Sequence, residues 1–104
     1  MNFFDLADTL LEISHPSALC TVVAISGSTP RKAGAKMLVL DSGDEFGEIR
    51  GTIGGGAIEH HIRALALDAI KQNQPRLITT SLRNELGMCC GGEMTVFIEP
   101  LKKP

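Results

Sequence analysis

The chain has 104 residues, a length at which proteins usually form one domain around one hydrophobic core. Apolar residues make up 43% and charged residues 21% of the chain, a composition that excludes a disordered protein. The formal net charge is -2 and the only aromatic residues are four Phe, so the chain offers neither the positive charge nor the stacking surface that nucleic acids need. We therefore expect a folded domain that does not bind nucleic acid.

The N-terminal segment predicts a helix. Asn2 can cap it, apolar residues follow at a spacing near 3.6, and Pro16 marks its end. The segment from Met1 to Glu12 carries acidic and no basic residues, which is not the pattern of a secretory signal. No apolar run approaches the ~20 residues of a membrane-spanning helix. We expect a cytoplasmic protein with no membrane partner.

Three strands are expected next. The apolar run Ala18–Ile25 predicts a central strand covered on both faces. A second strand is predicted at Ala35–Leu40, and the turn residues of Asp41–Asp44 lead into a hairpin partner at Phe46–Ile53.

The second half of the chain predicts a helix and two strands. The helix carries an apolar stripe at helical spacing, made of Ala57, Ile58, Ile62, Leu65, Ala66, Ala69 and Ile70. Leu67 lies off this stripe and is expected to face outward. After Pro75, strands are predicted at Arg76–Ser81 and Glu93–Glu99. The expected fold is a single α/β domain over residues 1–104, with a mixed β-sheet of about five strands and two main helices.

A run of three glycines, Gly54, Gly55 and Gly56, stands between a predicted strand and the start of the second helix. Glycine adopts positive φ readily, and an uncapped helix N-terminus presents N–H groups that bind anions such as phosphate. The spacing matches neither a dinucleotide-binding motif nor a Walker loop, so no nucleotide is specified. The alternative interpretation is an ordinary strand-to-helix turn.

Two adjacent cysteines, Cys89 and Cys90, precede Gly91 and Gly92 in a predicted loop. Backbone N–H groups exposed by glycine can lower a thiol pKa, which makes Cys90 a candidate nucleophile or soft-metal ligand. Adjacent cysteines are poorly suited to zinc chelation or to a mutual disulfide. The alternative is that cysteines act as small buried apolar residues, the interpretation we adopt for Cys20 and leave open for Cys89.

A third loop follows the predicted central strand and contains Ser28 and Arg31. Ligands of open α/β sheets often bind at the carboxyl ends of strands, where the Arg31 guanidinium could hold a phosphate or carboxylate. The alternative for Arg31 is a solvated loop side chain. His60 and His61 are interpreted as surface residues of the second helix, with no role assigned.

The three loops carry Gly27-Ser28-x-Pro30-Arg31-x-x-Gly34-x-x-Met37, then Gly51-x-Ile53-Gly54-Gly55-Gly56-x-x-Glu59, then Cys90-Gly91-Gly92. In this order the motifs resemble the N-terminal domain of the XdhC/CoxI family, and the resemblance extends over residues 6–100. Members of that family are accessory proteins that bind molybdenum cofactor, assist its sulfuration and deliver it to xanthine and carbon monoxide dehydrogenases. The adjacent cysteines Cys89 and Cys90 resemble the xanthine dehydrogenase branch of the family. The preceding residues Leu86–Met88 resemble the CoxI branch, so the branch stays open.

The resemblance implies molybdenum cofactor (molybdopterin) as cargo and the apo form of a molybdenum hydroxylase as partner, with a cysteine desulfurase as a further expected partner. Separately, we expect the chain to form a homo-oligomer. The cofactor phosphate is expected at the glycine run beside Arg31, Cys90 at the molybdenum end or passing sulfur, and Glu59 at the pterin amino group or orienting Arg31. The implied cofactor-binding residues are Ser28, Arg31, Gly54, Gly55, Gly56, Glu59, Cys90, Gly91 and Gly92.

The sequence departs from the family in two respects. Ala57 stands where many relatives carry Cys or His after the three glycines, and the Rossmann-like second domain of relatives is absent from residues 1–104. We identify no Ser-His-Asp triad, paired catalytic carboxylates or metal-ligand cluster in the sequence. We therefore favour a cofactor carrier over an enzyme. The first alternative is a non-catalytic oligomerising scaffold, with Leu67 at a subunit interface, or one part of a split maturation factor. The second alternative is a small nucleotide-dependent enzyme.

Overall fold

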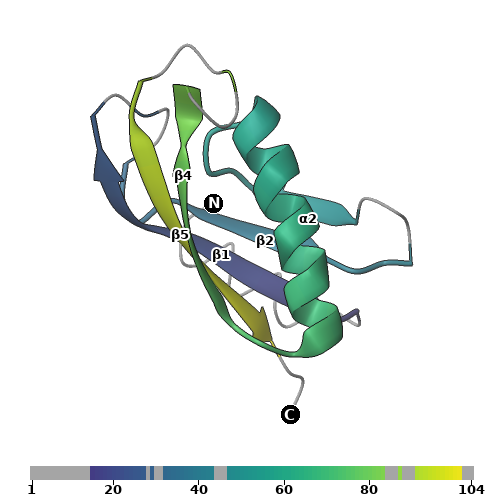
Figure 1. The fold of residues 1–104 in the computed structure, drawn as a ribbon. Coiled ribbons are helices and arrows are strands. Elements are labelled where there is room, and N and C mark those ends of the chain that lie inside the picture. The colour runs from purple at the N-terminus through teal and green to yellow at the C-terminus, as the bar shows by residue number, and fades with distance from the viewer. Residues whose placement is uncertain are drawn as a thin grey trace.

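The computed structural model describes residues 15–27, 29, 32–43, 47–83, 87 and 91–101. These residues form one sheet and one long helix (Figure 1), with the elements β1 (Ser17–Ser26), β2 (Lys36–Leu40), β3 (Glu48–Gly51), α2 (Gly56–Gln72), β4 (Arg76–Ser81) and β5 (Glu93–Leu101). The predicted α/β class, the five strands and their order along the chain are confirmed. The helix expected before Pro16 lies outside the described residues.

The five strands form one sheet in the order β3-β2-β1-β5-β4, so β1 is central as predicted. All four neighbouring pairs are antiparallel, and the expectation of a mixed sheet is wrong. The reason lies in the path of the chain. β3 and β4, which α2 connects, run in the same direction but form the two opposite edges of the sheet, so the crossover creates no parallel pair.

The main hydrophobic core lies between α2 and one face of the sheet (Figure 1). Alternate residues point to opposite faces of a strand, so β5 buries Met94, Val96 and Ile98 on the face that α2 covers. Ile58 and Ile62 supply fully buried side chains from the helix. A second, smaller cluster of Leu38 and Leu40 is packed against Leu19 and Leu101.

The carboxyl end of β1 differs from the prediction of a strand covered on both faces. Its first residues are buried, but Val23 is 46% and Ile25 is 39% exposed. β2 pairs only with Ser17–Thr21, and the pairing of β1 with β5 shifts register between Val22 and Ala24. The apolar run therefore continues beyond the segment that pairs with β2, and its last residues pair with β5 alone.

Leu67 is buried, and the prediction that it faces outward is wrong. Only 9% of it is exposed, and it belongs to the main core cluster. The backbone before β3 reaches the helix at this point, because a Cβ on Gly47 would lie 3.1 Å from Cδ2 of Leu67. The helix is thus covered on a second side, which its single apolar stripe did not indicate.

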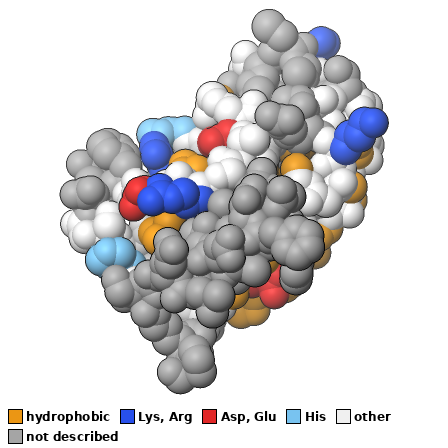
Figure 2. Space-filling view, turned by 180° about the vertical axis from the view of Figure 1, so that it is seen from behind, with side chains coloured by type: hydrophobic (Ala, Val, Ile, Leu, Met, Phe, Trp, Pro, Cys, Tyr) orange, Lys and Arg blue, Asp and Glu red, His pale blue; other side chains and the backbone are white. Residues whose placement is uncertain are grey.

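The described surface carries scattered charges. On the face seen in Figure 2, the described Lys and Arg side chains lie in separate places and do not form one continuous basic surface. None of the helical structure described here is long and apolar enough to cross a membrane.

Candidate functional site

At one end of the sheet, β1 and β4 end and β5 begins. Ser26, at the end of β1, pairs with Glu93, at the start of β5, and Glu93 also pairs with Ser81, at the end of β4. The helix α2 begins at this same end (Figure 1), because it runs opposite to β4. Arg76, the first residue of β4, is bonded at 2.9 Å to Asp68 in the second half of the helix. All three loops singled out in the sequence therefore leave or enter elements at this end.

The three glycines form a turn that opens directly into α2. Gly54, Gly55 and Gly56 have φ values of 144°, 76° and 56°, which confirms that this backbone needs glycine. Gly55 is the N-cap residue and makes no side-chain capping hydrogen bond. Gly54 and Gly55 are half-buried and Gly56 is exposed, so the first turn of the helix is accessible at a point where its dipole favours negative charge.

Glu59 supplies a negative charge at this turn. The Thr52 hydroxyl accepts a hydrogen bond of 3.1 Å from the N–H of Gly54 and donates one to Oε2 of Glu59. The same oxygen would lie 3.5 Å from a Cβ on Gly55. A carboxylate held here is favourable for the helix but repels a second anion at the same N–H groups. The sequence interpretation placed Glu59 in the site and missed Thr52, the side chain that orients it.

The first and third loops are in direct contact. A Cβ on Gly27, which has φ +69°, would lie 3.1 Å from the Cα of Gly92. The carbonyl of Gly92 accepts a hydrogen bond of 3.0 Å from the N–H of Leu82, just after β4. Since Leu82 is fully buried, this bond fixes the Gly92 backbone against the core.

Arg83 is the cation that the structure places at the third loop. Nη2 of Arg83 would lie 3.3 Å from a Cβ on Gly91, so the guanidinium packs against a backbone that carries no side chain. The residue is exposed, and neither an ion pair nor a hydrogen bond of its side chain is found within the described part of the chain. The sequence interpretation missed Arg83 because it belongs to no motif; its position two residues after the strand Arg76–Ser81 was the available signal.

The predicted site residues are only partly described. Gly54, Gly55, Gly56, Glu59, Gly91 and Gly92 lie at the same end of the molecule. Ser28, Arg31 and Cys90 lie outside the described residues, and so does Cys89. Among the residues that the structure describes, no group of three His, Cys, Asp or Glu side chains could hold a metal ion. Nδ1 of the exposed His60 lies 2.9 Å from Nη2 of Arg63.

Cys20 is buried in the centre of the sheet, as its apolar strand predicted. It is 0% exposed and is a free thiol. Removal from water raises the pKa of the Cys20 thiol from 9.0 to about 12, because burial disfavours the thiolate. The folded protein therefore keeps Cys20 protonated and unreactive at neutral pH, and any reactive cysteine must be another one.

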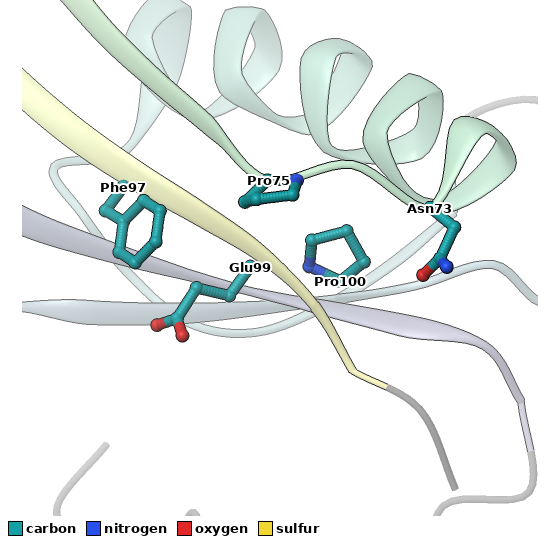
Figure 3. Close-up of a pocket in the computed structure, with 5 residues that line it drawn as sticks. All are labelled: Asn73, Pro75, Phe97, Glu99 and Pro100. Atoms are coloured by element: carbon teal, nitrogen blue, oxygen red, sulfur yellow. The ribbon is translucent and has the colours of Figure 1, made fainter.

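A hollow of about 220 Å³ lies at the opposite end of the molecule, near the end of α2 and the start of β4 (Figure 3). It is lined by Asn73, Pro75, Phe97, Glu99 and Pro100. Proline has no N–H to donate, and the carboxylate of Glu99 repels anions. The chemistry of this hollow is therefore unsuited to a phosphorylated ligand.

Two curated proteins are similar to this chain over 94% of its length. One is Uncharacterized protein YqeB of Escherichia coli strain K12, 39% identical over 102 residues. The other, from Bacillus subtilis strain 168, is named as a probable xanthine dehydrogenase subunit and is 32% identical over 104 residues. The chain spans 18% of the first and 30% of the second.

The fold also matches a solved structure. A crystal structure described as a xanthine dehydrogenase from Bacillus halodurans superposes with a TM-score of 0.87 and 27% sequence identity, covering 98% of this chain and 31% of that one. The family model of the XdhC and CoxI family matches residues 10–81, which include the first loop and the glycine turn. This chain therefore belongs to the XdhC and CoxI family.

Proposed function

We propose that this chain is an accessory protein of a xanthine dehydrogenase-type molybdenum hydroxylase, which binds molybdenum cofactor, holds it during sulfuration and delivers it to the apo-enzyme. Membership of the family supports the proposal, as do the relatives named for xanthine dehydrogenase. The observation that carries it is the arrangement of the loops. The glycine turn before α2 and the Gly91–Gly92 backbone, in contact with Gly27, lie at one end of the sheet.

The described residues at this end fit the chemistry of the cofactor. Molybdenum cofactor combines an anionic phosphate with a pterin ring whose amino group and ring N–H are hydrogen-bond donors. The exposed Arg83 guanidinium suits an anion. The Glu59 carboxylate is an acceptor suited to the pterin donors.

The proposal also assigns cofactor-binding roles to Cys90, Arg31 and Ser28. A thiolate is a soft ligand that suits molybdenum, which gives Cys90 a place at the metal end of the cargo. Arg31 adds a second guanidinium for the phosphate.

Retention of the cofactor by the purified chain tests the proposal. The chain is incubated anaerobically with molybdenum cofactor and passed through a desalting column, and the molybdenum and pterin that stay with the protein are measured. We expect the natural chain to retain both. Gly55→Asp should lower retention about tenfold or more, because it strains the turn at positive φ and repels the Glu59 carboxylate, 3.5 Å from the new Cβ, out of its position. Cys90→Ala should lower the molybdenum retained.

Gly43→Asp is the matched control. Gly43 also has positive φ, +92°, and a Cβ there would meet nothing within 4 Å. It lies just after β2, at the other end of the sheet from the proposed site, so it imposes the same added charge without touching that site. Retention equal to the natural chain in Gly43→Asp is expected. The proposed site is wrong if both Gly55→Asp and Cys90→Ala also retain the cofactor undiminished.

A further inference from the structure

We propose an orientation for the ligand, which rests on the proposed function: Arg83 binds the phosphate, and Glu59, held by Thr52, binds the pterin amino edge. The sequence alone also placed Glu59 at the pterin amino group or beside Arg31, but it placed the phosphate at the glycine turn. Glu59 at the glycine turn and Arg83 at the third loop favour a different arrangement.

The glycine turn already holds an anion of its own. Oε2 of Glu59 accepts a hydrogen bond from Thr52 and lies beside Gly55. Because Thr52 also accepts from the Gly54 N–H, the carboxylate is positioned by a chain of two hydrogen bonds. A phosphate at these N–H groups would face the Glu59 charge at short range, whereas an amino group would be attracted to it. The turn is thus better suited to a donor than to a second anion.

The third loop offers the opposite chemistry. The Arg83 guanidinium lies against Gly91, is exposed, and has no carboxylate partner in the part of the chain that the structure describes. The backbone at Arg83 is held in place, because the neighbouring Leu82 is buried and the Leu82 N–H donates a hydrogen bond to the Gly92 carbonyl. An exposed guanidinium positioned in this way matches the oxygens of a phosphate.

The covalent structure of the cofactor agrees with this division. Its pyran ring carries both the phosphomethyl group and the dithiolene that holds the metal, while the amino group is at the far end of the fused ring system. A phosphate on Arg83 therefore brings the metal end toward the Gly91–Gly92 backbone, and leaves the amino edge for Glu59. The negative phosphate then contacts the positive guanidinium of Arg83, and the amino group donates hydrogen bonds to the carboxylate of Glu59.

Two fragments of the cofactor test the orientation separately. Inorganic phosphate and hydroxymethylpterin, which has no phosphate, are each titrated into the isotope-labelled 104-residue chain, and amide NMR shifts are followed. We expect phosphate to shift Gly91 and Gly92, and hydroxymethylpterin to shift Gly55. Arg83→Gln should weaken phosphate binding about tenfold and leave pterin binding unchanged, whereas Glu59→Gln should do the reverse.

Two further variants separate charge from position. Gly91→Ala keeps every charge but places a Cβ 3.3 Å from Nη2 of Arg83, so it should weaken phosphate binding severalfold by displacing the guanidinium. Arg50→Gln is the control, because Arg50 is exposed, paired with Glu48 and located on β3. The spectra themselves report whether each variant is folded.

The outcomes distinguish this inference from the function on which it rests. Phosphate shifts at Gly54–Gly56 that survive Arg83→Gln would overturn the orientation, even if the natural chain retains the whole cofactor. Failure of the natural chain to retain cofactor would instead overturn the proposed function. Loss of phosphate binding in Arg83→Gln, with Arg50→Gln unaffected, supports the orientation.

Discussion

At the scale of single residues, the glycines of this chain serve different purposes. Gly27 lets two loops touch, and Gly55 forms the N-cap of α2. Gly47 has a purely structural role, because a Cβ there would lie 2.8 Å from the carbonyl oxygen of Leu40 and 3.1 Å from Leu67. Gly43, close by in the sequence, has positive φ but open space around it.

This contrast predicts different losses of stability for the same substitution. Gly43→Ala should lower the free energy of unfolding by about 1 kcal/mol, the usual strain of a side chain at positive φ. Gly47→Ala should lower it by about 1–3 kcal/mol more, because it also forces Leu40 and Leu67 apart. Urea unfolding of the two variants measures the difference. Equal losses would show that the contact at Gly47 is not tight.

Some residues of the candidate site could be predicted from their residue type, and others could not. The glycines and Glu59 could be identified because positive φ and a helix N-terminus have sequence signals. Thr52 and Arg83 were missed, because residue type does not reveal their roles, which depend on the group that the fold brings beside each: Glu59 for Thr52 and Gly91 for Arg83. Ser28, Arg31 and Cys90 remain predictions.

At the scale of elements, local pattern predicted most boundaries. The strand Arg76–Ser81 was predicted with the bounds that β4 has, and α2 begins one residue before the predicted stripe. Strand direction could not be predicted, because the positions of β3 and β4 in the sheet depend on contacts between distant segments. The burial of Leu67 was missed for the same reason, since Gly47 covers it from outside the helix.

The burial of Leu67 can be tested against a leucine on the sheet. Leu67→Ala should lower the free energy of unfolding by about 2–4 kcal/mol, because it removes a side chain that is only 9% exposed. Leu77→Ala makes the same chemical change on β4, where the side chain is 66% exposed, and should cost less than about 0.5 kcal/mol. Thermal and urea unfolding provide the values. A small loss for Leu67→Ala would restore its assignment to an outer surface.

At the scale of the whole molecule, the two ends of the sheet have different chemistry. One end joins the glycine turn, Glu59, Arg83 and the Gly91–Gly92 backbone, which together offer hydrogen-bond donors and acceptors and side chains of both charges. The other end has the hollow beside Pro75 and Glu99, which offers little to an anion (Figure 3). The resemblance of three motifs indicated the family, and the fold supplied what the motifs lacked, namely their common location at one end.

The central claim is that both turns at this end bind one ligand, and amide NMR during an anaerobic titration with whole molybdenum cofactor tests it most directly. We predict that Gly54–Gly56 and Gly91–Gly92 shift together along one saturation curve, while Asn73 and Phe97 at the other end stay unchanged. Shifts confined to Asn73 and Phe97, or to one turn alone, would contradict it.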